Sequence, residues 1–161
     1  MVNQSRNQGD SQFVPGSLGN LNSDLPFETL LKIQKLKVEE LTGIELCPTY
    51  SFARLYTTGN ELPKHKDRPA CEISVTAKLG DTENYNWPIF IDGTKIELNV
   101  GDAVIYKGCE VMHWREKHEV PGYYLGQVFL HYVDKNGAYS DYRYDKFYQK
   151  EEFFTKDITK E

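Results

Sequence analysis

The chain has 161 residues, of which 39% are hydrophobic and 27% are charged, and its formal net charge is −5. This length and composition are typical of one globular domain and leave little room for a second domain with its own core. The acidic total argues against a nucleic-acid backbone as the main partner. No stretch approaches the roughly 20 apolar residues of a membrane span.

The cysteines indicate the redox compartment. Cys47, Cys71 and Cys109 are widely spaced and form no C-x-x-C pair. An odd number of cysteines without a secretory leader predicts reduced thiols, and we therefore expect a cytoplasmic protein.

The N-terminal third of the chain predicts an arm followed by one helix. Residues 1–24 are rich in Asn, Gln, Ser and Gly, which is typical of a flexible or irregular arm. Residues 25–161 are expected to form a single domain. Apolar positions from 27 to 42 give a helical stripe, with Asp24 as its N-cap and Gly43 at its end. We expect this helix to pack on the outside of a sheet.

After Pro48 the pattern changes to short apolar segments separated by turn signals such as Asp92-Gly93 and Gly101-Asp102. Seven or eight short strands at this spacing indicate a mainly β sandwich or barrel. In the tail, residues 145–155 predict a short covering helix. The predicted strands span residues 50–56, 71–79, 87–91, 95–98, 103–106, 111–115 and 124–133.

His65, Asp67 and His113 are the candidate metal ligands. Side chains two residues apart lie on the same face of an extended backbone, so His65 and Asp67 can contact one ion. His113, on a later predicted strand, can supply the third ligand. Two imidazoles and one carboxylate on one side of ferrous iron form a facial triad, which leaves positions open for a chelating cosubstrate and dioxygen. The residues therefore predict an iron(II) oxygenase.

The motifs around these residues resemble a known family. Residues 53–68, ARLYTTGNELPKHKDR, resemble the Y-x-x-G-x-x-L-x-x-H-x-D signature of the prolyl-hydroxylase-like, 2-oxoglutarate- and iron(II)-dependent oxygenases. Residues 101–108 and then His113 resemble the second half of that pattern, and the resemblance covers about residues 48–135. It implies a double-stranded β-helix (jelly roll), in agreement with the strand count. It also implies that dioxygen hydroxylates a substrate while 2-oxoglutarate is decarboxylated to succinate.

The anchor for the far carboxylate of 2-oxoglutarate departs from the family pattern. Many relatives place an Arg or Lys on the final strand, but residues 120–127 contain neither. Arg115 lies two residues past His113 and shares its side of an extended strand, and its planar fork can hold a carboxylate. Lys78 on the polar face of its predicted strand is the second candidate. Tyr56 matches the family tyrosine and is expected to donate its hydroxyl to the same cosubstrate.

The substrate and two rival functions stay open at this point. The resemblance makes a prolyl residue of a peptide or protein the first expected substrate, with a free amino acid or small metabolite as the alternative. Nucleic-acid demethylation is not favoured, because no basic and aromatic patch is evident. One rival is a cupin-like metalloenzyme without an oxoacid, although cupins usually supply more histidines and a glutamate. The other is a non-catalytic jelly-roll binding module in which His65 and His113 are incidental.

Four further residues have simpler predicted roles. His131 is expected to point inward as a hydrogen-bonded core residue. His118 lies in the charged segment Glu116-Lys117-His118-Glu119 and is expected to be solvated. Arg54 and Arg68 are expected either to line the substrate entrance or to pair with acids at its rim.

Overall fold

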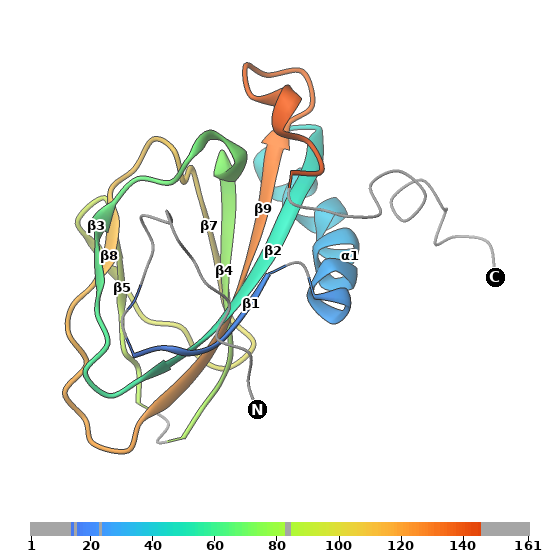
Figure 1. The fold of residues 1–161 in the computed structure, drawn as a ribbon. Coiled ribbons are helices and arrows are strands. Elements are labelled where there is room, and N and C mark those ends of the chain that lie inside the picture. Colours follow the sequence, from blue (N-terminus) through green and yellow to red (C-terminus); the bar gives the residue numbers. More distant parts are fainter. Residues whose placement is uncertain (1–13, 15, 23, 83–84, 146–161) are drawn as a thin grey trace.

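The structure is a computed structural model that describes residues 14, 16–22, 24–82 and 85–145. Its strands form two facing sheets, with the five-stranded order β1-β2-β9-β4-β7 and the four-stranded order β3-β8-β5-β6 (Figure 1). Neighbouring strands are antiparallel, so the predicted mainly β jelly roll is confirmed. The strands are β1 (Leu18–Asn22), β2 (Leu46–Thr57), β3 (Leu62–His65), β4 (Ile73–Asp81), β5 (Ile89–Ile91), β6 (Thr94–Ile96), β7 (Ala103–Tyr106), β8 (His113–Arg115) and β9 (Tyr124–Asp134).

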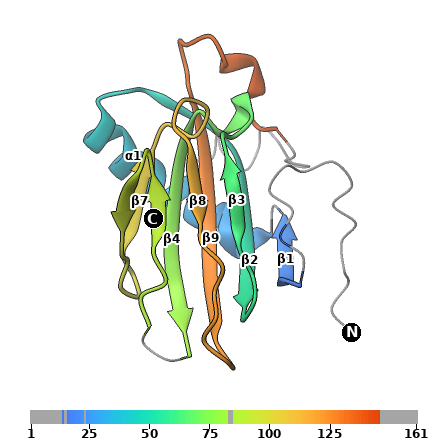
Figure 2. The ribbon, with the colours of Figure 1, turned by 90° about the vertical axis from the view of Figure 1, so that its left-hand side faces the viewer.

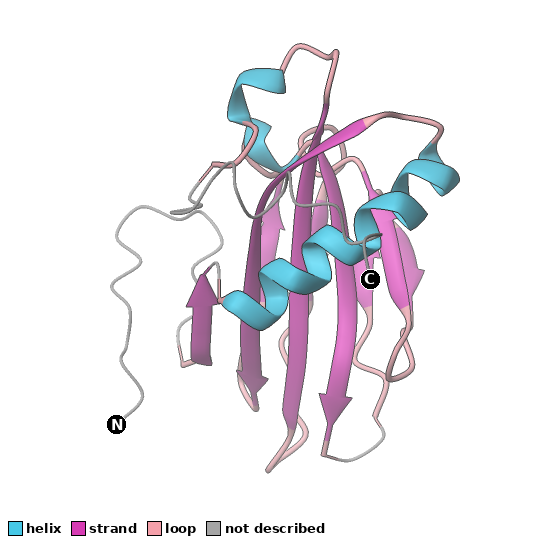
Figure 3. Ribbon diagram, turned by 90° about the vertical axis from the view of Figure 1, so that its right-hand side faces the viewer, coloured by secondary structure: helices cyan, strands magenta, loops and turns pink. Residues whose placement is uncertain are grey.

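Helix α1 (Leu25–Thr42) crosses the outer face of the five-stranded sheet, as predicted (Figure 3). Its fully buried Leu31 and Val38 belong to a cluster with apolar residues of β2, β4 and β9. Asp24 occupies the N-cap position, but its side chain makes no capping hydrogen bond. Gly43 ends the helix in the left-handed conformation, with φ of 71°. The helix therefore supports the sheet from outside and leaves its inner face to the site.

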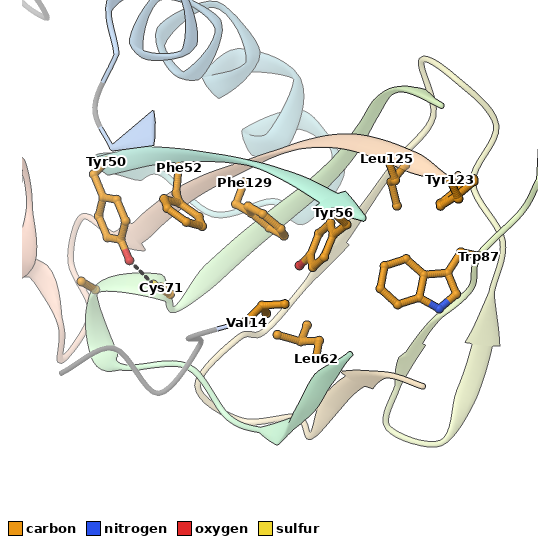
Figure 4. Packing of buried hydrophobic residues seen from close by; sticks show 11 residues of the cluster. Val14, Tyr50, Phe52, Tyr56, Leu62, Cys71, Trp87, Tyr123, Leu125 and Phe129 are labelled. Carbon is orange, nitrogen blue, oxygen red and sulfur yellow. Dashed lines mark hydrogen bonds between the residues drawn. The ribbon is translucent and has the colours of Figure 1, made fainter. Parts of the chain in front are cut away.

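The inner face of the five-stranded sheet presents a row of aromatic side chains. Tyr50, Phe52 and Tyr56 point inward from β2, and Phe129 points inward from the neighbouring strand β9 (Figure 4). Trp87 meets the Tyr56 ring edge-on at 5.2 Å between ring centroids. Burial of such rings supplies most of the stabilisation of a core, at roughly 25 cal/mol per Å². The space between the sheets is thus largely filled by aromatic residues.

Two predicted turns are present and have clear conformational causes. Asp92 and Gly93 have φ of 49° and 79° and join β5 to β6 in a two-residue hairpin. That turn requires positive φ at both central positions, which Asp tolerates and Gly adopts freely. Gly101, with φ of 90°, makes the turn that precedes β7.

Several segments differ from the sequence prediction, and some strands of the structure were not predicted. The strand predicted from residue 71 begins at Ile73, because Pro69–Cys71 form a 3-10 turn that Pro69 begins. The short strand β3 was not predicted. It lies beside β8 in front of the five-stranded sheet in Figure 2. The predicted arm contains β1, which pairs with β2. The predicted covering helix lies outside the described residues, except for Asp145.

In residues 14–145, apart from the four positions that are not described, no helix combines the length and the apolar content that spanning a membrane would require.

Candidate metal centre

The pairing of β3 with β8 brings His65 and His113 together. The two residues are cross-strand partners in this antiparallel pair, and their ring centroids lie 4.2 Å apart. Residues directly opposite each other on one face of a sheet have their side chains in contact. His113 is buried, with 2% of its surface exposed. The register of two short strands therefore brings together two of the three candidate ligands.

Asp67 reaches the same point from the loop that follows β3. Its backbone N–H donates to the Gly108 carbonyl at 2.8 Å, which fixes the loop against the turn before β8. Its Oδ1 atom lies 3.5 Å from Nε2 of His65 and 3.4 Å from Nε2 of His113. Ligand atoms of all three residues lie within 4.8 Å of one another, so the group can hold a metal ion.

The two histidine rings are oriented as metal ligands usually are. Nδ1 of His65 lies 2.7 Å from the Pro63 carbonyl, and Nδ1 of His113 lies 3.2 Å from the Val111 carbonyl. When a cation binds, donation of Nδ1–H to these carbonyls leaves the Nε2 lone pair of each ring for the ion beside Asp67. The donor set and its orientation therefore fit a divalent cation.

The Asp67 carboxylate is held in its charged form. Burial by itself raises the pKa of Asp67, but hydrogen bonding to His113 and His65 and the charge of His131 outweigh it, so the pKa lies well below its ordinary value. The Ser74 hydroxyl donates to the second oxygen, Oδ2, at 3.1 Å. Asp67 thus provides a fixed negative charge for a cation.

A small cavity opens beside the three residues. Its free volume is about 10 Å³, which is the room that one water molecule or a metal ion needs. Arg54 and Tyr56 of β2 form one wall. Arg54 is only 3% exposed, and its position two residues before Tyr56 on an extended strand is the sequence signal that places it inside. The lining residues are Arg54, Tyr56, Leu62, His65, Asp67, Ile89, Tyr106, His113, Phe129 and His131.

The three residues predicted to bind the cosubstrate lie in different surroundings. Tyr56 is fully buried and lines the cavity, with its hydroxyl 3.4 Å from the Arg54 guanidinium. Arg115 is 2% exposed and lies behind Tyr56, with its guanidinium 5.9 Å from the Tyr56 ring centroid. Lys78 is 4% exposed and forms an ion pair of 2.6 Å with Asp81.

Arg115 is a buried cation whose charge has no acidic partner within the described parts of the chain. One guanidinium nitrogen donates to the Trp87 carbonyl, and the group lies 5.0 Å from the Trp87 ring centroid. Burial lowers the pKa of Arg115, which is the effect expected for a charge removed from water. A ligand carboxylate would supply the missing partner.

Three of the remaining predictions can be compared with the structure. His131 is buried, as predicted, and its Nδ1 lies 3.0 Å from the Ser74 hydroxyl. The prediction for His118 was wrong, because it is only 1% exposed and stacks on Tyr123 at 4.1 Å between ring centroids. Its charged neighbours in the sequence point to water while its ring turns inward. Arg68 pairs with Asp145.

Comparison with known proteins places the fold but not the family. No protein-family model matches the chain, and no curated protein sequence matches it. Three solved structures resemble it at low identity. The non-heme α-ketoglutarate-dependent epimerase SnoN of nogalamycin biosynthesis has 13% identity and a TM-score of 0.58, and the match covers 71% of this chain and 60% of the epimerase.

A 2-oxoglutarate–Fe(II) oxygenase-family oxidoreductase from Burkholderia pseudomallei has 18% identity and a TM-score of 0.54, with 73% of this chain and 61% of the other covered. A prolyl-4-hydroxylase from Pseudomonas putida has 15% identity and a TM-score of 0.52, with 72% and 71% covered. The chain thus spans about three fifths of the first two proteins. Cupin proteins are among the matches as well. The protein is therefore a jelly-roll protein with a His-Asp-His group that can hold a metal ion.

Proposed function

We propose that this protein is an iron(II)- and 2-oxoglutarate-dependent dioxygenase. One observation carries the proposal: inside a jelly roll, the Nε2 atoms of His65 and His113 lie 3.5 and 3.4 Å from the same oxygen of Asp67. Two imidazoles and one carboxylate are the protein ligands of the facial triad, the arrangement of non-heme iron oxygenases.

Each residue has a definite task in this proposal. His65, Asp67 and His113 hold iron(II), and Arg115 binds the far carboxylate of 2-oxoglutarate with help from the Tyr56 hydroxyl. When bound, iron and 2-oxoglutarate supply the oxidising chemistry, with dioxygen as the oxidant and succinate as the coproduct. The aromatic wall excludes water from the reacting atoms. The cavity of about 10 Å³ has room for about one water molecule, so we expect side chains of the wall to move when an oxoacid binds.

Arg115 is the better anchor than Lys78 on electrostatic grounds. The Lys78 charge is already matched by Asp81 at 2.6 Å, and its ammonium also donates to Asn86 at 3.3 Å. A new carboxylate would have to displace that acid. The Arg115 guanidinium has no acidic partner among the described residues and can hold a carboxylate bidentately.

The proposal also names a class of reaction and a class of substrate. The three solved structures named above include an oxygenase-family protein, a prolyl-4-hydroxylase and an epimerase. These names support an oxoglutarate enzyme as the class, and we propose hydroxylation as the reaction. A prolyl residue of a peptide or protein, or a small molecule of similar size, is the proposed substrate.

Anaerobic calorimetry of the metal-loaded protein tests the anchor. We expect Arg115→Gln to weaken 2-oxoglutarate binding at least about thirtyfold, because loss of one partner of a buried charge pair costs about 2 kcal/mol or more. Its iron affinity should be unchanged. Lys78→Met is the matched control and should change the affinity for 2-oxoglutarate less than Arg115→Gln does.

Three results would contradict the proposal in different ways. Equal effects of the two substitutions would remove Arg115 as the specific anchor. Iron binding without any 2-oxoglutarate binding in the unsubstituted protein would favour the cupin-like alternative. Absence of metal binding would favour a non-catalytic module.

A further inference from the structure

Asp67 belongs to a second group of metal-binding side chains. A carboxylate oxygen of Asp67, the Cys71 sulfur and a ring nitrogen of His131 lie within 4.8 Å of one another. The Ser74 hydroxyl links this group, since it donates to Oδ2 of Asp67 at 3.1 Å and lies 3.0 Å from Nδ1 of His131. The histidines of the first group approach the other oxygen, Oδ1. Asp67 therefore lies between two sets of donors.

Two members of the second group line the same cavity as the first group. Asp67 and His131 both line it, together with His65 and His113. Cys71 does not line the cavity and is fully buried at the 3-10 turn of Pro69–Cys71. An ion in the cavity therefore meets Asp67 and His131, and the Cys71 sulfur lies within 4.8 Å of their ligand atoms.

The register of the five-stranded sheet creates this second group. Ser74 of β4 is the cross-strand partner of His131 of β9, which places the histidine opposite the start of β4. Cys71 lies two residues before the first residue of β4, at the end of the 3-10 turn. Its sulfur lies 3.2 Å from the Tyr50 hydroxyl of β2 (Figure 4). One donor, His131, therefore lies on strand β9, and contacts with residues of β4 and β2 hold Asp67 and Cys71 beside it.

The donor chemistry selects a different class of metal from the first group. Cys71 is fully buried and carries a thiol proton, which an incoming cation must displace. Soft or borderline cations form thiolate bonds strong enough to do so, whereas magnesium and calcium prefer oxygen ligands. Three protein ligands including a cysteine and a histidine are typical of zinc sites with an open position.

We propose that Asp67, Cys71 and His131 form a second metal site, for a soft divalent cation such as Zn²⁺ or Cd²⁺, next to the His65–Asp67–His113 site. Binding releases the Cys71 proton to solvent and involves no oxidation or reduction. The site goes beyond the proposed dioxygenase activity and does not require it. If Cys71 and His131 served only to support Asp67, no metal–thiolate bond would form.

Cadmium titration of the metal-free protein tests this site through thiolate ligation. The background is the double variant Cys47→Ser/Cys109→Ser, in which Cys71 is the sole thiol. We expect two Cd²⁺ per chain by equilibrium dialysis, and one of them should give the ultraviolet thiolate-to-cadmium charge-transfer band. Adding His131→Gln should weaken the band-forming site at least about tenfold, as loss of a ligand-shell residue commonly does.

Two further variants separate this site from the first. Cys71→Ser should lose the band and one Cd²⁺, while circular dichroism reports whether the fold is kept. His65→Ala should keep the band and lose the other Cd²⁺. Absence of the band in the background variant, or a band that His131→Gln leaves unchanged, would overturn the second site. Unchanged cadmium stoichiometry in His65→Ala would instead count against the first site alone.

Discussion

At the scale of single residues, Gly108 shows how tightly the candidate metal centre is packed. A Cβ added there would lie 2.4 Å from the Cys71 carbonyl, 2.5 Å from Oδ2 of Asp67 and 2.6 Å from the Ser74 hydroxyl. We expect Gly108→Ala to displace Asp67 and to weaken binding of Fe²⁺ or Co²⁺ at least about tenfold. We also expect it to lower the free energy of unfolding by about 1–3 kcal/mol, as overpacking does.

Gly126→Ala is the matched control for this substitution. Its added Cβ would meet nothing closer than 3.8 Å. Metal titration and urea unfolding of the two variants should therefore separate them, and equal metal affinities would show that the close packing at Gly108 does not position Asp67.

His118 should make the stability of the folded protein depend on pH. Its ring contacts Tyr123, Tyr85 and Trp87, and burial, followed by the nearby Arg115 charge, lowers its pKa from the ordinary value of 6.5. The unfolded chain therefore binds a proton more readily, and stability should fall as the pH drops below 6.5, by up to about 1.4 kcal/mol per pH unit. Urea unfolding at several pH values should show this slope and its reduction in His118→Phe. An unchanged slope would contradict the assignment.

At the scale of elements, the contact between α1 and β2 includes one buried carboxylate. Glu28 accepts hydrogen bonds from the backbone N–H and the hydroxyl of Ser51, both at 2.8 Å. We expect Glu28→Ala to lower the free energy of unfolding by about 2–3 kcal/mol, because it leaves a buried donor without its charged acceptor. Metal affinity should stay the same, since the helix lies outside the sheet.

The control for this element is Glu40→Ala on the solvent side of the same helix. Glu40 pairs with Lys37 at 2.8 Å, but its side chain is 68% exposed, so its loss should change stability by about 0.5 kcal/mol or less. If Glu28→Ala were no more destabilising than Glu40→Ala in urea titrations, the buried contact would not hold α1 on the sheet.

At the scale of the whole molecule, the site joins the two sheets. His65 and His113 belong to the four-stranded sheet, whereas Asp67 accepts a hydrogen bond from Ser74 of the five-stranded sheet. Metal binding should therefore stabilise the entire fold, by about 2.7 kcal/mol at a free-metal concentration one hundred times the dissociation constant. Thermal unfolding with and without Co²⁺ should show a rise in midpoint that is smaller in His113→Ala. The same rise in this variant would place the stabilising ion elsewhere.

Much of the fold was predictable because local rules agree with it. Turns such as Asp92-Gly93 require positive φ, and residue alternation identified the inward face that carries His113 and Arg115. The convergence of Cys71 and His131 was not predictable, because it depends on the register of β4 against β9. His118 was mispredicted since its neighbours are charged, although its own ring finds an aromatic partner 4.1 Å away.

The central claim is that His65, Asp67 and His113 hold an iron(II) ion that 2-oxoglutarate chelates. The most direct test is anaerobic addition of Fe(II) and then 2-oxoglutarate to the metal-free protein, followed by visible spectroscopy of the weak charge-transfer band of the chelate. We expect the band in the unsubstituted protein and its loss in His65→Ala. Iron binding without the band, or a band that persists in His65→Ala, would contradict the account.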